Sequence, residues 1–337
     1  MKKVSLRDIA EELGVSKTLV SLVMNGKAEE NRISQEVIER VKRVAKEKGY
    51  EPNQFAKALR TGKSMTIGLI VADISNSFYS KMARSIEDTA YGSNYTVLFG
   101  SSDEDPAKAE KLIKVMLDRQ IDGLIISPTI GGHQNIDLIK KHKIPFILVD
   151  RPLSGVKSSF VGVNNLEASF EAVDTMLKSG CTRIAHINFY QELGNMKDRF
   201  NGYVKAHEAS GLTVDPSLII HVSNDRAVGE IQQFIDHVGD KVDAFFFANN
   251  EIAIIAIKYL MHSNIDPHRD VSIACFDDHE AFHLLKASIG VIKQPVVEMG
   301  KKALELLLER IESNGKAHQT ITLSTEYAVL NEELARK

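Results

Sequence analysis

Four polar residues lie close together near the N-terminus, in a segment whose apolar residues repeat at helical spacing. They are Ser16, Lys17, Thr18 and Ser21. Hydroxyl and ammonium groups can hydrogen-bond to the edges of bases, and a lysine can reach guanine O6 and N7 in the major groove. These residue types and this spacing therefore favour nucleic-acid recognition, with contact to phosphate as the alternative role of Lys17.

Two short helices must hold these side chains in position. Ser5 followed by Asp8 is a helix-start signal, and Ser16 can cap a second helix. Between them, Gly14 can adopt the left-handed conformation that ends a helix, and Asn25-Gly26 ends the second one. The pattern predicts a helix-turn-helix, with an ordinary helical hairpin as the alternative. The expected core residues are Leu6, Ile9, Leu13, Val15, Val20 and Val23.

Several further motifs, spread along most of the chain, resemble those of one protein family. They are residues 15–21 with Asn25-Gly26, 50–62, 66–71 with 73–76, 149–152, 276–278 and 293–295. From residue 4 to about residue 330 the chain is similar to the lactose-repressor/galactose-repressor (LacI/GalR) family of bacterial transcription regulators. The resemblance implies a DNA-binding head, a hinge helix and a two-lobed core like that of periplasmic binding proteins.

The resemblance also implies which residues contact DNA. Leu59 matches the leucine that in relatives wedges between base pairs in the minor groove, and Ala56 is small where two hinge helices approach. Packing inside an ordinary linker helix is the alternative for Leu59. Leu19 and Leu22 replace the usual Thr and Arg, so we expect an operator that differs from the commonest family sequence. The predicted DNA-contacting residues are Ser5, Ser16, Lys17, Thr18, Ser21, Leu22, Asn25, Asn53, Ala56 and Leu59.

The chain has 337 residues, and its charge is distributed unevenly. The net charge is only −3, but residues 1–63 hold 14 Lys and Arg against 9 Asp and Glu, which makes the N-terminal segment basic. Cys181 and Cys275 stand alone, apparently on strands, and are expected to be buried thiols of a reducing compartment. No signal sequence or membrane span is recognisable, so we expect a cytoplasmic protein.

From residue 65 onward, apolar strands alternate with amphipathic helices, and the alternation restarts near residue 161. This pattern predicts an α/β fold with two lobes, each built on a parallel sheet covered on both faces. By the resemblance, each lobe is discontinuous. The expected divisions are a helix-turn-helix domain at 1–49, a hinge helix at 50–63 and an effector-binding core at 64–337, with lobe 1 at about 64–161 and 294–321 and lobe 2 at about 162–291 and 322–337.

Polar residues follow the strands of both lobes. Ligands of open α/β sheets bind beyond the carboxyl ends of the strands, so two facing lobes form a cleft. Carboxylates, amides, a guanidinium and aromatic rings suit a polyhydroxylated ring, and the resemblance implies a small-molecule effector, a sugar, a sugar derivative or a purine-like molecule. Interlobe salt bridges or strand-end caps are the alternative. The predicted effector-binding residues are Phe78, Tyr79, Asp150, Arg199, Asn249, Asp277 and Gln294; Gln294 could instead contact only the backbone between the lobes.

The sequence contains none of the usual motifs of enzymes or metal sites. The histidines form no metal-binding pair, Gly131-Gly132 is no dinucleotide fingerprint, and no nucleophile elbow occurs, so we expect no cofactor, metal or catalytic residue. By the resemblance we expect a homodimer, because the heptad tail that some relatives use to form tetramers does not follow the last strand. The expected partner is a near-palindromic double-stranded operator. The alternatives are a regulator controlled by a protein co-effector, a sugar-binding transport component and a nicotinamide-dependent enzyme.

Overall fold

Two compact units, Met1–Ser64 and Met65–Lys337, make up the chain in a computed structural model. The structure describes residues 4–50, 62–189, 194–223, 225–263, 265–267, 269–313 and 317–331. Most of the predicted hinge helix, with its DNA-contacting candidates Asn53, Ala56 and Leu59, lies outside the described residues.

The N-terminal unit contains α1 (Leu6–Leu13), α2 (Lys17–Met24) and α3 (Gln35–Glu47). Ser5 and Asp8 form a reciprocal capping box, in which the Asp8 carboxylate accepts from the Ser5 backbone N–H at 2.7 Å. Gly14 ends α1 with a φ of 65°, and the Ser16 hydroxyl accepts from the Leu19 N–H at 3.1 Å. The predicted helix-turn-helix is confirmed. All three helices contribute to its core, which includes Ile9, Ala10, Val20, Val23 and Val41.

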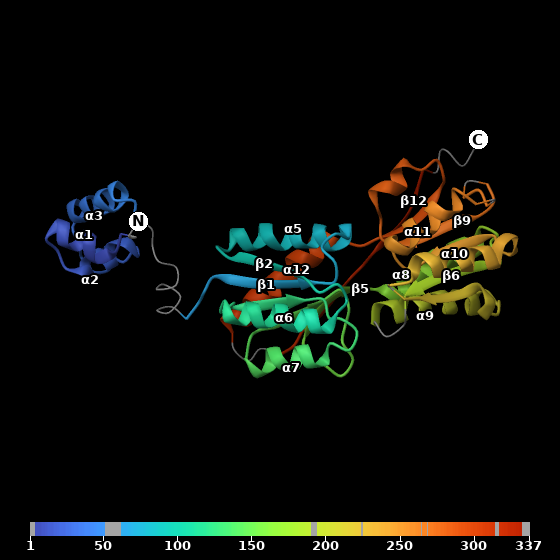
Figure 1. The fold of residues 1–337 in the computed structure, drawn as a ribbon, viewed down its shortest axis with the longest axis horizontal. Helices are drawn as coiled ribbons and strands as arrows, with labels where there is room; N and C mark the ends of the chain where they lie inside the picture. The colour runs from blue at the N-terminus through green and yellow to red at the C-terminus, as the bar shows by residue number, and fades with distance from the viewer. Residues whose placement is uncertain are drawn as a thin grey trace. The chain divides into compact units, whose positions relative to one another are not determined.

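Lobe 1 of the second unit is built on a parallel sheet in the order β11-β5-β4-β3-β1-β2. Helices α5 and α12 cover one face, while α6 and α7 cover the other (Figure 1). Such two-sided burial explains the continuous apolar strands. The strands are β1 (Thr66–Val71), β2 (Thr96–Ser101), β3 (Gly123–Ile126), β4 (Phe146–Val149), β5 (Ser159–Val163) and β11 (Thr320–Leu323), and the helices are α5 (Ser77–Gly92), α6 (Pro106–Asp118), α7 (His133–Lys141) and α12 (Val296–Glu312).

Lobe 2 repeats this architecture with the sheet order β12-β10-β9-β8-β6-β7. Helices α8 and α9 contribute to one core cluster and α10 and α11 to another, and β12 pairs antiparallel with β10. The strands are β6 (Ile184–Phe189), β7 (Ile219–Val222), β8 (Ala244–Phe247), β9 (Ser272–Phe276), β10 (Ile289–Lys293) and β12 (Glu326–Leu330), and the helices are α8 (Asn165–Lys178), α9 (Gly194–Ala209), α10 (Ala227–Val238) and α11 (Asn250–Leu260). Short 3-10 helices lie at Pro216–Leu218, Gly239–Lys241 and Glu280–Leu284.

The chain crosses between the lobes three times. It leaves lobe 1 between β5 and α8, returns between β10 and α12, and leaves again between β11 and β12. The expected α/β fold with two sheets is therefore present. One local expectation was wrong: Cys181 is buried but precedes β6 in a loop, because β6 begins only at Ile184, whereas Cys275 lies on β9 as expected. No helix among the described residues is long and apolar enough to cross a membrane.

A neutral histidine lies in the core of lobe 2. His186 is fully buried, stacks on Tyr203 and Phe246 at 4.9 and 5.1 Å between ring centroids, and its Nδ1 lies 3.0 Å from the Phe246 carbonyl oxygen. Burial lowers the pKa of His186 to about 3. The unfolded chain therefore takes up a proton below a pH of about 6.5 that the folded state does not accept.

We expect His186 to make the second unit lose stability in mild acid. Between pH 7 and pH 5 the difference in proton uptake costs about 2 kcal/mol, and the loss continues as the pH falls toward 3. Urea unfolding at both values should show a smaller drop for His186→Phe than for the unchanged chain. An equal drop in both proteins would contradict the assignment.

Candidate functional site

The first candidate site is the start of α2 in the N-terminal unit. Lys17 and Thr18 are exposed and make no side-chain bond to another described residue, so both remain available to a partner. The other candidates already have structural roles or partial burial. Ser5 and Ser16 cap helices, the Asn25 side chain donates to the Ser21 carbonyl oxygen at 2.5 Å, and Leu22 is half-buried. Base contact at these positions stays a prediction.

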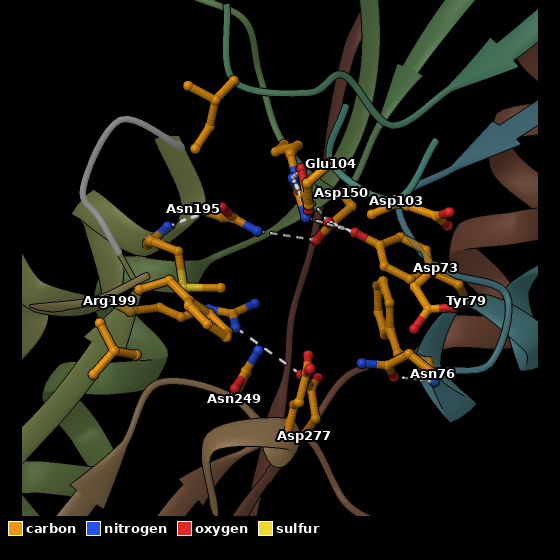
Figure 2. A pocket seen from close by; sticks show the side chains of 18 of the residues that line it. Asp73, Asn76, Tyr79, Asp103, Glu104, Asp150, Asn195, Arg199, Asn249 and Asp277 are labelled. Carbon is orange, nitrogen blue, oxygen red and sulfur yellow. Dashed lines mark hydrogen bonds and ion pairs between the residues drawn. The ribbon is translucent and has the colours of Figure 1, made fainter. Parts of the chain in front are cut away.

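The second candidate site is a cavity of about 590 Å³ between the lobes of the second unit. All seven predicted effector-binding residues line it, because they follow strands or lie near the starts of helices at the facing edges of the two sheets (Figure 2). Three residues that were not among the predicted ones also line the cavity: Glu104, Arg151 and Asn195. The cavity is large enough for a small metabolite.

On the lobe 1 side, a closed polar network surrounds Asp150. The Tyr79 hydroxyl donates to Asp150 Oδ2 at 2.7 Å, and Arg151 Nη2 donates to the Tyr79 oxygen at 2.8 Å. Arg151 Nη1 also donates to both oxygens of Glu104, at 2.7 and 2.9 Å. Burial raises the pKa of Tyr79, so its hydroxyl stays protonated and acts as a donor to Asp150.

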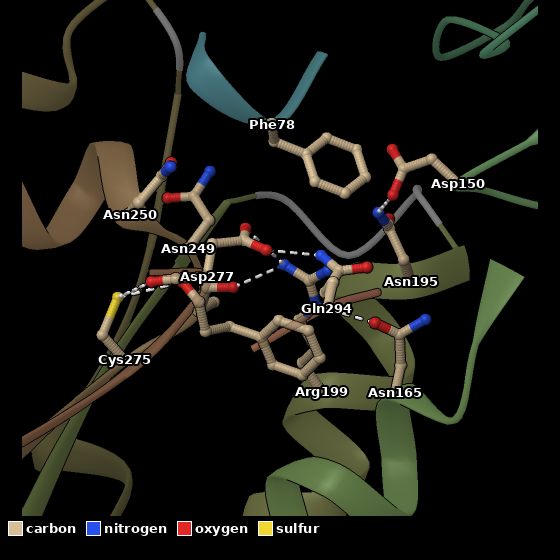
Figure 3. Close-up of polar contacts among 12 residues, drawn as sticks. Phe78, Asp150, Asn165, Asn195, Arg199, Asn249, Asn250, Cys275, Asp277 and Gln294 are labelled. Atoms are coloured by element: carbon tan, nitrogen blue, oxygen red, sulfur yellow. Dashed lines mark hydrogen bonds and ion pairs between the residues drawn. The ribbon is translucent and has the colours of Figure 1, made fainter. Parts of the chain in front are cut away.

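On the lobe 2 side, Arg199 is held from several directions (Figure 3). Its Nε donates to Asn165 Oδ1 at 2.9 Å, and Nη1 donates to the Ala248 carbonyl oxygen at 2.7 Å. Nη1 also lies 3.9 Å from Asp277 Oδ2, and the guanidinium carbon lies 3.6 Å from the centroid of the Phe276 ring. The Arg199 residue is only 2% exposed, so its guanidinium is fixed before any ligand arrives.

Asp150 and Asp277 occupy matching places in the two lobes. Each follows a strand directly, has a φ near 70°, and donates its backbone N–H to the neighbouring parallel strand, at Val161 and Ile292 respectively. Left-handed backbone is uncommon for residues other than glycine and costs about 1 kcal/mol or more. The turn directs both carboxylates into the cavity, which favours a role in binding over a role as simple strand-end caps.

Direct contacts bridge the cleft. Asn195 Nδ2 of lobe 2 donates to Asp150 Oδ1 of lobe 1 at 3.3 Å, and Asn76 Nδ2 donates to Asn250 Oδ1 at 3.4 Å. Figure 2 shows Asn195 extending toward Asp150 across the cavity. The rings of Phe78 and Tyr79 pack edge to face, with 5.0 Å between their centroids, and form an aromatic wall. The cavity therefore combines an aromatic wall with polar groups from both lobes.

The amide side chains of Gln294 and Asn249 have different partners in the site. Gln294 Nε2 donates to Asp277 Oδ1 at 2.5 Å, which places this predicted residue beside the carboxylate rather than only beside the backbone. Asn249 Oδ1 caps α11 by accepting from the Ile252 N–H at 2.9 Å, so Asn249 combines a helix cap with a place in the cavity wall. Burial raises the pKa of Asp277, an effect that Arg199 opposes. Within the described part of the chain no group of three His, Cys, Asp or Glu side chains could hold a metal ion.

Comparison with known proteins gives consistent matches to both units. Residues 5–53 match the family described as bacterial regulatory proteins of the lacI family, and residues 173–329 match a periplasmic binding protein-like domain. The transcriptional regulator RegA of Clostridium saccharobutylicum is 30% identical over 309 residues, covering 90% of this chain and 92% of that protein.

Solved structures share the fold. The regulator CelR in complex with cellobiose is 23% identical, covers 97% of this chain and 98% of that chain, and has a TM-score of 0.71. The Cra regulator of Pseudomonas putida in complex with fructose 1-phosphate is 22% identical, covers 78% of this chain and 98% of that chain, and has a TM-score of 0.70. Proteins of this fold thus include one complex with an uncharged sugar and one with a phosphorylated sugar.

Proposed function

The chain belongs to the LacI family of bacterial regulatory proteins, and from this premise we propose that a small-molecule effector, a sugar or sugar derivative, controls its binding to DNA. As a member of that family it is a DNA-binding transcriptional regulator. The observation that supports the proposal most strongly is the cavity between the lobes, which is lined from both sides by preformed polar groups and an aromatic wall.

We propose the remaining features from the same premise. The protein acts in the cytoplasm as a homodimeric repressor without enzymatic activity, with residues 1–49 as head, 50–63 as hinge helix and 64–337 as effector-binding core. Two heads related by a twofold axis would occupy two half-sites of a near-palindromic operator. Effector binding would change the closure of the cleft and thereby the spacing of the heads. Control by a protein co-effector is the second candidate function.

Footprinting and a ligand screen test this proposal. Two protected half-sites, with affinity that falls steeply as salt increases, are the expected result. In a thermal-shift screen of sugars, sugar derivatives and nucleobases, the compound that binds the cleft should raise the melting temperature of the second unit. Protection of one asymmetric half-site by a monomer would contradict the dimeric arrangement, and stabilisation by a partner protein alone would favour the co-effector.

Lys17 offers a direct test of base reading by α2. Loss of a bidentate contact to guanine removes about 1–3 kcal/mol of discrimination, so Lys17→Ala should weaken operator binding about tenfold or more and relax the preference at one base pair. Lys46→Ala, in the last turn of α3, removes the same charge from the same unit and serves as the control. If Lys17 contacts only phosphate, specific and non-specific affinity will instead fall together, and the salt dependence will weaken.

A further inference from the structure

The cavity between the lobes is strongly acidic. Among the residues that the structure describes, seven carboxylate side chains line it, against two guanidinium groups and no lysine. Two of the seven, Asp103 and Asp225, pair with Lys108 and Arg226 outside the lining. The remaining excess of three carboxylates would repel a phosphate or carboxylate group on a ligand unless a positively charged side chain were free to meet it. The availability of Arg151 and Arg199 therefore determines which charge the ligand can carry.

The protein itself already neutralises Arg151. Its side chain is 6% exposed, and Nη1 is held by both oxygens of Glu104 at 2.7 and 2.9 Å. Its Nε lies 3.3 Å from Asp150 Oδ2, and Nη2 donates to Tyr79. A ligand phosphate could bind Arg151 only by displacing the Glu104 carboxylate, whose charge-assisted hydrogen bonds are about twice as strong as those between neutral groups.

Arg199 is also engaged, but less completely. Nε and Nη1 are used by Asn165 and the Ala248 carbonyl, and the nearby Asp277 balances the charge. Nη2 makes no bond to any described residue and can donate to a ligand oxygen in the cavity. One neutral acceptor, such as a hydroxyl oxygen, fits this donor without adding a negative charge beside Asp277.

Two carboxylates at the cleft have no ion-pair partner among the described residues. Asp73 follows β1 of lobe 1, where it accepts only from Ser75, and Glu251 lies in the first turn of α11 in lobe 2. Partial burial raises the pKa of Glu251, and the nearby carboxylates of Asp73 and Glu104 raise it further. Hydroxyl or ammonium hydrogens can satisfy these oxygens, whereas an anion would add to their mutual repulsion.

We infer that the effector of this cleft carries no phosphate or carboxylate group and is an uncharged sugar or an amino sugar. The inference rests on the proposed small-molecule control and restricts its ligand class. Cellobiose, the ligand in the CelR complex, meets this requirement, whereas fructose 1-phosphate, the ligand in the Cra complex, does not.

Binding of sugars and of their amino and phosphate derivatives to the full chain tests the inference. Calorimetry and thermal shift should compare glucose, glucosamine and glucose 6-phosphate, fructose and fructose 1-phosphate, and cellobiose. At least one uncharged or amino compound should bind, and each phosphate ester should bind at least about tenfold more weakly than its parent. Tighter binding of a phosphate ester would overturn the inference while leaving small-molecule control intact. Absence of binding by any uncharged, amino or phosphorylated compound would overturn both.

Three charge variants test whether the pairing of Arg151 with Glu104 is what excludes a phosphate group. Glu104→Gln removes the carboxylate that pairs with Arg151 and should increase affinity for fructose 1-phosphate about tenfold over the unchanged chain. Glu110→Gln changes the net charge equally on α6, outside the cavity, and should leave that affinity unchanged. Glu251→Gln, which removes a cleft carboxylate without freeing a guanidinium, should give a smaller increase. Equal affinities in all three variants would overturn the inference, and circular dichroism confirms that each variant folds.

Discussion

Replacing Gly202 with alanine is expected to destabilise the second unit by about 3 kcal/mol or more. Gly202 lies on α9 where this helix packs against α8, and an added Cβ would lie 2.7 Å from Ser169 Cβ and 2.9 Å from the Phe170 backbone nitrogen. It would lie still closer to the Leu166 carbonyl oxygen. Because two of the three neighbours are backbone atoms, the helices must separate, and overpacking of this kind exceeds the usual cost of about 1–3 kcal/mol.

Gly229 provides the matched control for this substitution. It also lies within a helix, α10, but an added Cβ meets no atom within 4 Å. Gly229→Ala should therefore stabilise the protein by about 0.5–1 kcal/mol, the gain in helix propensity. The chain has no tryptophan, so urea unfolding is best followed by circular dichroism. Equal effects of the two substitutions would mean that α8 and α9 are not packed closely.

Arg199→Ala is expected to reduce both stability and effector binding. The substitution leaves the buried Asp277 without its compensating charge and removes bonds to Asn165 and Ala248, a change that costs about 3 kcal/mol. The donor Nη2 that faces the cavity is lost as well. Urea unfolding and titration with an effector identified in the ligand screen measure the two consequences separately.

A double substitution separates the two roles of Arg199. Arg199→Met with Asp277→Asn removes the buried charges together, and asparagine tolerates the left-handed backbone at residue 277. The double variant should recover much of the lost stability but not effector binding. Should Arg199→Ala cost less than about 1 kcal/mol, the buried ion pair would not contribute as described.

Periodicity and capping signals were sufficient to predict the helix-turn-helix and the two sheets. The rule that ligands bind beyond the carboxyl ends of parallel strands also placed all seven predicted effector residues at one cavity. The exact start of α5 depends on a local cap: the helix begins at Ser77, where the Asn76 side chain accepts from the Phe78 N–H at 3.0 Å.

Loop residues of the site could not be predicted in the same way. Glu104 meets Arg151 only because the loop after β2 adopts left-handed backbone at two successive residues, Asp103 and Glu104. Asn195 reaches Asp150 from the first turn of α9, across the cleft. Neither contact follows from residue type or spacing, since both depend on tertiary geometry. The motif at residues 149–152 contained Arg151, and its charge beside Asp150 was the one available signal.

The three crossings between the lobes have a consequence for synthesis on the ribosome. Lobe 1 lacks α12 and its edge strand β11 until residue 323 has been made, and lobe 2 lacks β12 until residue 330. The N-terminal unit, in contrast, is continuous within its first 64 residues. Because domains fold as units during translation, nascent chains would carry a finished DNA-binding head well before either half of its regulatory core is complete. A chain interrupted before α12 would thus retain the means to contact DNA without the cleft that governs it.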